Sequence, residues 1–294
     1  MQDPTARDDR PAWLRERREA AEPGAPDPGV PEAPRPGSEA GPGGPGPGGP
    51  RRAPATRLPT PYVTWAILAI NTLMLIVIGV RSGGGIGFVD PNGAVLCQLG
   101  ALNSTAIAEH HQWWRLLTVM VLHGGVIHFA LNSWALWLFG PTLEYVLGRA
   151  RFLALYVVSG LAGSAASFAL GHTEIGVGAS GAIFGLLGAL VAFFWRRRNM
   201  GAGGQLRSLL LVLLINLIWG ASQRGGIDLI AHVGGFVAGL LAMGLLEVAA
   251  PRGRAASSLA LAVPAVLALL LVGYGVASFS GGLVDCANLP PGLP

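Results

Sequence analysis

Long uninterrupted runs of apolar residues, separated by short polar clusters, are the dominant pattern of the chain from residue 61 onward. A helix needs about 20 residues, with a range of about 17–25, to cross the hydrocarbon core of a bilayer. Seven segments meet or approach this length, at Tyr62–Val80, Arg115–Phe139, Phe152–Gly171, Ser180–Trp195, Leu206–Gly220, Asp228–Val248 and Ser257–Phe279. The pattern therefore predicts an all-α polytopic membrane protein with seven spans.

Residues 1–58 form a separate region in which Pro, Gly and Ala dominate, as in GPGGPGPGGP at positions 41–50. This region lacks the periodic apolar positions with which a chain buries a core, so we expect a disordered tail. No apolar stretch follows Met1, and we expect no signal peptide. The predicted division is a tail at 1–58, a membrane core at 59–250, and a last helix with a short tail at 251–294.

The composition agrees with a membrane protein, because hydrophobic residues make up 51% of the 294 positions and charged residues only 12%. A soluble domain carries about 25% charged residues. The net charge of +4 does not indicate nucleic-acid binding, since all 20 basic residues are Arg and they form no basic face with interleaved aromatics. We therefore expect the lipid bilayer, and no nucleic acid, as the surroundings of this chain.

The placement of arginine predicts the orientation in the membrane. Clusters of Arg precede the first span and lie between spans two and three, four and five, and six and seven, whereas the opposite connections carry only Arg81 and Arg224. Cytoplasmic connections carry the excess of basic residues. We therefore expect an integral protein of a bacterial plasma membrane, with a cytoplasmic N-terminal tail and an extracytoplasmic C-terminus.

Two cysteines, Cys97 and Cys286, fall together on the outer side in this topology. An extracytoplasmic compartment permits disulfides, so we expect a Cys97–Cys286 bridge, with two unpaired thiols as the alternative. No CxxC or Cys/His spacing is typical of a metal site. We expect neither a metal ion nor a cofactor.

Polar groups inside a membrane are costly, so three polar clusters within the spans call for an explanation. In the first, His128 and Asn132 are four residues apart in the outer part of span two and share one helix face. Both side chains can donate hydrogen bonds to an anion or a carbonyl oxygen. The alternative for this pair is helix packing through interhelical hydrogen bonds.

The second cluster places Ser180 where a glycine-containing loop enters span four. Free backbone N–H groups at a helix N-terminus stabilise a developing oxyanion. Gly178 and Gly181 on either side let a substrate backbone approach closely. The alternative is a small-residue face used only for helix packing.

The third cluster is His232 near the outer end of span six, followed by the pair Gly235 and Gly239, which permits close helix contact. A neutral His can act as general base when a Ser hydroxyl is in reach, and the alternative is a His bonded to a backbone carbonyl. The chain has no Lys, which excludes a Ser–Lys dyad, and Asp228 is better placed as the N-cap of span six. Together the clusters predict a Ser180–His232 dyad with oxyanion donors.

This ordered set of residues resembles the rhomboid family of intramembrane serine proteases. The matching positions extend over about residues 60–250 and are Trp114-Arg115, His123, His128, Asn132, Gly178-Ala-Ser180-Gly181, and Ala231-His232 with Gly235 and Gly239. The resemblance implies a six-helix catalytic core, to which a seventh transmembrane helix is added here. It implies that Ser180 attacks a peptide carbonyl, that His232 takes its proton, and that His128, Asn132 and the Ser180 backbone N–H hold the oxyanion.

The resemblance also implies supporting roles and a substrate class. Arg115 would organise the first loop, Glu144 would be structural, and Phe184 would pack on the His232 ring. Substrates would be single-span membrane proteins cleaved in their transmembrane segments. Two other functions stay open at this point, a non-catalytic rhomboid-like protein that escorts membrane clients and a channel or transporter. The sequence does not specify the substrate or the oligomeric state.

Overall fold

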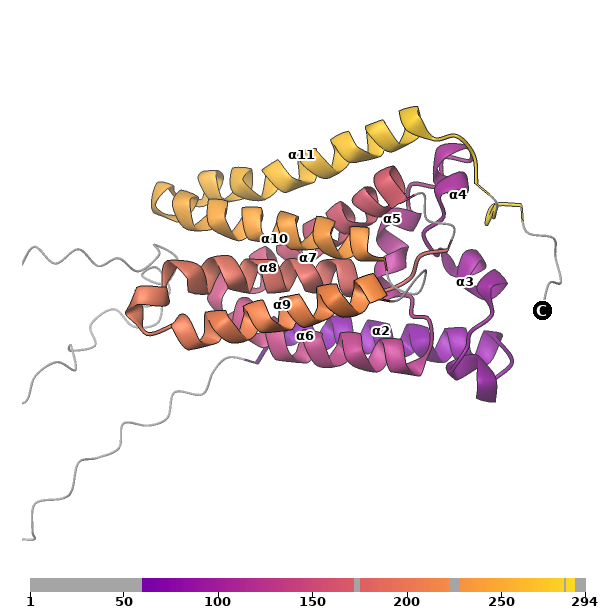
Figure 1. The fold of residues 1–294 in the computed structure, drawn as a ribbon, viewed down its shortest axis with the longest axis horizontal. Helices are drawn as coiled ribbons and strands as arrows, with labels where there is room; N and C mark the ends of the chain where they lie inside the picture. Colours follow the sequence, from indigo (N-terminus) through magenta and orange to yellow (C-terminus); the bar gives the residue numbers. More distant parts are fainter. Residues whose placement is uncertain (1–59, 172–174, 223–227, 283, 289–294) are drawn as a thin grey trace, which may run out of the picture. The chain divides into compact units, whose positions relative to one another are not determined.

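The computed structural model describes residues 60–171, 175–222, 228–282 and 284–288 (Figure 1). The chain divides into two units, Met1–Pro59 and Thr60–Pro294, and the predicted tail at 1–58 lies outside the described residues. Within the described part, the secondary structure is helical apart from one isolated antiparallel bridge between Leu102 and Gly176. The all-α prediction is therefore confirmed.

In the described part of the chain, seven long helices overlap the seven predicted segments. They are α2 (Tyr62–Arg81), α6 (Val126–Leu147), α7 (Arg149–Ala166), α8 (Ser180–Arg196), α9 (Gly203–Ser222), α10 (Leu229–Ala249) and α11 (Arg254–Ser278). Shorter helices lie between them, namely η1 (Gly85–Phe88), α3 (Gly93–Leu99), α4 (Ser104–Ala108), α5 (Arg115–Thr118), η2 (Val119–Val121), the π-helical η3 (Ser167–Gly171), η4 (Arg198–Met200) and η5 (Ala250–Arg252).

Length and apolarity make this a multi-pass membrane protein. Four helical segments can cross a bilayer alone, at Tyr62–Arg81, Arg149–Gly171, Leu229–Ala249 and Ala256–Ser278, and a bent pair of helices can form a fifth span. Ser180–Arg196 and Gly203–Asn216 are shorter apolar helices. At 1.5 Å per residue, the 17 residues of α8 extend only about 26 Å, less than the roughly 30 Å of a hydrocarbon core.

The second span differs from the prediction of one helix over Arg115–Phe139. The chain bends by 91° after η2, and α6 begins only at Val126 and continues to Leu147. Gly125 causes the break, because its φ of +101° is a left-handed conformation that glycine adopts readily. A Cβ atom there would also lie 2.2 Å from Val89 O. His123 consequently precedes the helix instead of lying within it.

Helix α8 lies at the centre of the bundle and contacts α6, α7, α9 and α10 (Figure 1). Its residues from Gly181 to Val191 are all buried, as expected for a helix that is apolar all round. Glycines bring α8 and α10 into contact in a parallel arrangement. The Cβ of an alanine at Gly235 would lie 1.9 Å from Gly181 O, and one at Gly239 would lie 1.9 Å from Gly185 O.

Two buried carboxylates hold helix ends in place. Glu247 near the end of α10 pairs with Arg196 at 2.9 Å and with Arg197, both at the end of α8. Glu144 on α6 accepts hydrogen bonds from the Thr64 backbone N–H and hydroxyl, each at 2.8 Å, at the start of α2. The structural role that the family resemblance implied for Glu144 thus has a physical basis, because a carboxylate satisfies the free N–H groups of a helix start.

Candidate active site

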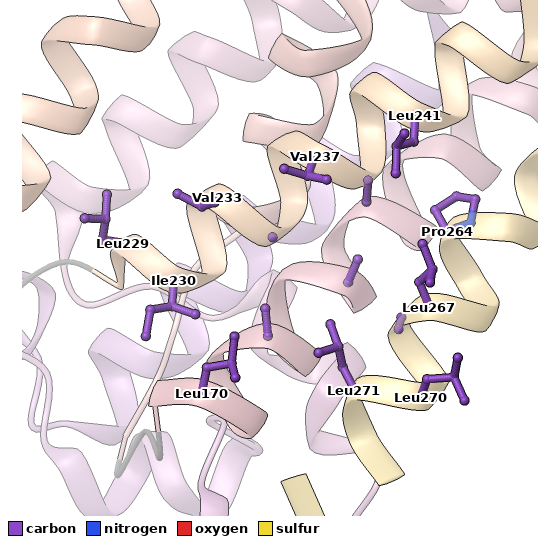
Figure 2. Close-up of a pocket in the computed structure, with 15 residues that line it drawn as sticks. Leu170, Leu229, Ile230, Val233, Val237, Leu241, Pro264, Leu267, Leu270 and Leu271 are labelled. Atoms are coloured by element: carbon purple, nitrogen blue, oxygen red, sulfur yellow. The ribbon is translucent and has the colours of Figure 1, made fainter. Parts of the chain in front are cut away.

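A groove of about 700 Å³ lies between α7, α10 and α11 (Figure 2). Its lining consists of Leu, Ile, Val, Ala, Gly and Pro side chains, such as Leu170, Val237 and Pro264. These residues offer neither a nucleophile nor a titratable group. The groove is therefore a lipid-compatible surface, and the polar clusters predicted from the sequence lie elsewhere.

Ser180 is the first residue of α8, where the segment after Ile175 enters the helix. Gly178 has a φ of +133° and donates its N–H to Val119 O at 3.0 Å, which fixes the approach of the loop. A methyl group on Gly178 would lie 2.9 Å from His128 Nε2 and 3.4 Å from Ser180 Oγ. The imidazole and the hydroxyl therefore border the same small space, which glycine leaves open.

His232 lies on the face of α10 that meets the start of α8. A Cβ atom at Gly181, the residue after Ser180, would lie 3.6 Å from Ala231 O. The His232 ring stacks on Phe184, with centroids 4.1 Å apart and planes inclined by 11°. Phe184 follows Ser180 by one helical turn, so the two side chains share a face of α8.

No hydrogen bond joins Ser180 to His232 among the described residues, although helix packing brings them to the same level. His232 is buried, and its Nδ1 has no hydrogen-bond partner within the described part of the chain. Hydrogen bonds between a nucleophile and its base are often loose in the absence of substrate. The geometry thus brings together the predicted pair without a closed contact.

His128 and Asn132 lie one turn apart on α6, as predicted. The Gly124 N–H donates to His128 Nδ1 at 3.3 Å, so a neutral ring carries its proton on Nε2, the atom that faces Gly178. One N–H of the Asn132 amide donates to His128 O at 2.9 Å, which leaves a second donor on the same nitrogen. The buried His123 ring packs edge-on to His128 with centroids 5.5 Å apart.

Asp228 caps α10, as the sequence predicted. Its Oδ1 accepts from the Ala231 N–H at 2.8 Å, and its Oδ2 accepts from the Ser167 hydroxyl. Both carboxylate oxygens therefore have hydrogen-bond partners other than the His232 ring. A cavity of about 30 Å³ lies between Asp228, Ser180 and Gly178, which is room for about one water molecule.

The first loop supports the segment before Ser180. Cys97 and Cys286 form the expected disulfide, and the Arg115 guanidinium donates to Cys97 O at 2.8 Å and to Ala101 O at 2.9 Å. The pairing of Leu102 with Gly176 was not predicted, because a bridge between residues 74 positions apart leaves no local signal in the sequence.

Comparison with known proteins agrees with this geometry. Residues 110–248 match the model of the Rhomboid domain, and this range contains all six predicted site residues. The chain is 36% identical over 186 residues to rhomboid protease GluP of Bacillus subtilis (strain 168), which covers 63% of this chain and 35% of that protein. It is 37% identical over 131 residues to putative rhomboid protease YdcA of the same organism, covering 44% of this chain and 65% of the relative.

A similar likeness extends to plants, where RHOMBOID-like protein 1 of Arabidopsis thaliana is 37% identical over 155 residues, or 52% of this chain and 39% of that protein. The chain thus spans about a third to two thirds of the length of these relatives. The matched region covers α6, α7, α8, α9 and most of α10, the helices that carry the candidate site. Residues 110–248 of this chain are thus a Rhomboid domain, and the chain is similar to curated rhomboid proteases.

Proposed function

We propose that this chain is an intramembrane serine endopeptidase that cleaves transmembrane segments of single-span membrane proteins. The observation that carries the proposal is the parallel packing of α8 on α10, with Ser180 and His232 at the same level and His128 Nε2 beside them. The names of the two Bacillus relatives, both called rhomboid protease, support the same activity.

The arrangement suits acyl transfer in two steps. Ser180 Oγ attacks the peptide carbonyl while the His232 ring takes the hydroxyl proton, and an Oγ–C bond forms. The C–N bond then breaks, and the His232 proton passes to the leaving amine. A water molecule next attacks the acyl-enzyme with His232 again as base, which releases the carboxylic acid and restores Ser180.

In this proposal, three donors stabilise the oxyanion that forms during attack. The Ser180 backbone N–H lies at the free N-terminus of α8, and His128 Nε2 carries a proton toward the same space. The Asn132 amide keeps one N–H available. Removing one such donor typically lowers kcat about 10²–10³-fold, and Gly178 and Gly181 leave room for the substrate backbone.

The base acts without an acidic partner in this proposal. Asp228 is the nearest carboxylate along α10, and its oxygens accept hydrogen bonds from Ala231 and Ser167. The His232 ring is oriented instead by stacking on Phe184. Asp228→Asn should therefore keep the N-cap acceptor and most of the activity.

The depth of the site follows from the short α8. If the Arg196–Arg198 end lies at the cytoplasmic interface, as the placement of arginine predicts, the Ser180 end stops about 4 Å short of the outer edge of a 30 Å hydrocarbon core. Substrate bonds that Ser180 can reach would then lie within the membrane near its outer face. The N-terminal tail would be cytoplasmic and the end of the chain extracytoplasmic.

The test uses the full chain in proteoliposomes with a fluorescent single-span reporter protein. Wild type and Ser278→Ala, a substitution at an exposed position of α11, should release the fragment at equal rates, while Ser180→Ala and His232→Ala should reduce release to background. A Ser180→Ala variant that still cleaves would refute the proposal. Folding is checked in every variant by its apparent Tm.

A further inference from the structure

The segment that follows α11, Val284–Asn288, is joined to the first loop by the disulfide between Cys97 and Cys286. These two cysteines are 189 residues apart in the sequence. The Asn103 amide donates to Val284 O at 3.0 Å and accepts from the Cys286 N–H at 3.3 Å. Val284 and Ala287 pack against the buried residues Cys97, Ala106 and Cys286. Figure 1 shows α3 and α4 beside this segment at one end of the bundle. The segment is thus held by a covalent bond, hydrogen bonds and apolar contact.

Arg115 joins this segment to the loop at a second point. Its guanidinium is buried, with 3% of the residue exposed, and it donates to the carbonyls of Cys97 and Ala101 and to Cys286 O at 3.5 Å. Its Nε donates to Gln112 Oε1 at 2.7 Å. A buried charge is costly unless its donors are satisfied. Cys286 O is therefore one of four acceptors that keep Arg115 in place.

Three consecutive loop residues connect these anchors to the serine. Ala101 O is held by Arg115, Asn103 is held by Val284 and Cys286, and Leu102 lies between them. Leu102 exchanges two hydrogen bonds of 2.8 Å with Gly176. Gly176 precedes Ser180 by four residues, so the Leu102 pairing forms one edge of the loop that presents the nucleophile.

We propose that Val284–Asn288 is a positioning element for the Ser180 loop and acts through Ala101–Asn103. The inference rests on the proposed function, since it concerns the rate at which Ser180 reacts. Without the segment, Ala101–Asn103 loses its outer partners and Arg115 loses an acceptor, and the Leu102–Gly176 pairing opens more often. An active site loses about 10²-fold in rate when a reacting group moves by about 1 Å.

A matched control lies in the same segment. Asp285 pairs with His110 at 3.0 Å on the surface, and neither side chain is part of the disulfide or of the hydrogen bonds to Asn103. Burial opposes ionisation of Asp285, yet hydrogen bonds from the Ala287 N–H, Asn288 and His110 hold the pKa of its carboxyl below the ordinary value. An exposed ion pair contributes little stability. Asp285→Asn therefore changes the segment but keeps its disulfide and its hydrogen bonds with Asn103.

The test compares oxidised wild type, the double variant Cys97→Ala/Cys286→Ala and Asp285→Asn in proteoliposomes. The double variant should show a kcat at least tenfold lower per fluorophosphonate-titrated site, with KM within about twofold. Amide hydrogen exchange should rise in peptides covering 101–103 and 175–179 but not 235–239. Asp285→Asn should match wild type. A lower Tm with unchanged kcat and unchanged exchange at 175–179 would overturn the proposal.

A second measurement tests the proposal on wild type alone, in case the double variant does not fold. Wild type already in the bilayer is reduced with a phosphine until mass spectrometry finds both thiols free, and the rate should fall and then recover on reoxidation. An unchanged rate after complete reduction would overturn the proposal. If wild type neither cleaves nor labels, the proposed protease function fails, whereas the exchange comparison still tests the link between Val284–Asn288 and the serine loop.

Discussion

Replacing Gly239 with alanine tests whether the contact between α8 and α10 sets the position of His232 relative to Ser180. Gly239 lies two turns beyond His232, roughly 10 Å along the helix axis, and touches no candidate site residue. The new Cβ would lie 1.9 Å from Gly185 O, whereas ordinary contact begins at 3.4 Å. A backbone carbonyl cannot rotate away, so the helices must separate locally by roughly 1.5 Å.

A displacement of this size near the dyad predicts a kcat about 10²-fold lower, because about 1 Å of misplacement costs that much. Overpacking should also destabilise the protein by about 1–3 kcal/mol, seen as a lower apparent Tm. The assay is cleavage of the single-span reporter in proteoliposomes, at a temperature at which the variant is folded.

Gly244→Ala, on the same helix, is the matched control. A Cβ atom at Gly244 would have no neighbouring atom within 4 Å. This variant should retain wild-type kcat and a Tm that is equal or higher, because alanine favours helix over glycine by about 1 kcal/mol. A folded Gly239→Ala variant with wild-type kcat would refute the reasoning, and so would an equal loss in both variants.

Three further predictions address other parts of the molecule. His128→Ala removes the Nε2 donor and should lower kcat about 10²–10³-fold without lowering the apparent Tm; an unchanged kcat would exclude His128 from the site. Glu247→Gln weakens the buried pair with Arg197 at the far end of α8, so Tm should fall while kcat per titrated site stays unchanged; a loss of kcat would contradict this. Because the pKa of Asp285 is lowered in the folded state, its ionised carboxylate adds to the free energy of unfolding at neutral pH. This contribution to stability is lost as the pH falls below about 4. The Tm of wild type should then approach that of Asp285→Asn in acid, and a gap that widens in acid would argue against the pair with His110.

Much of the fold could be predicted from the sequence because a bilayer imposes a strong pattern on the chain. Each predicted span except the second overlaps one long helix, since only an apolar run that satisfies its own backbone can cross hydrocarbon. The second span was predicted wrongly because the bend at Gly125 depends on its close contact with Val89, a residue of the first loop. Hydropathy cannot distinguish a bent apolar segment from a straight one.

The residues of the candidate site were also predictable, whereas their support was not. Ser180, His232 and His128 are polar groups in apolar segments, so they stand out in the sequence. The register that places Gly235 against Gly181 is set by packing between helices and cannot be deduced from either glycine pair alone. The same holds for the Leu102–Gly176 bridge, which depends on tertiary contact.

The most direct test of the Ser180–His232 dyad is peptide mass spectrometry after a fluorophosphonate reacts with folded protein. The probe loses fluoride and leaves a phosphonyl group on a serine that a neighbouring base has activated. The dyad predicts one adduct, on Ser180, in wild type and in Gly244→Ala, and none above background in His232→Ala. An adduct on another serine, or equal labelling of Ser180 in folded His232→Ala, would contradict the dyad.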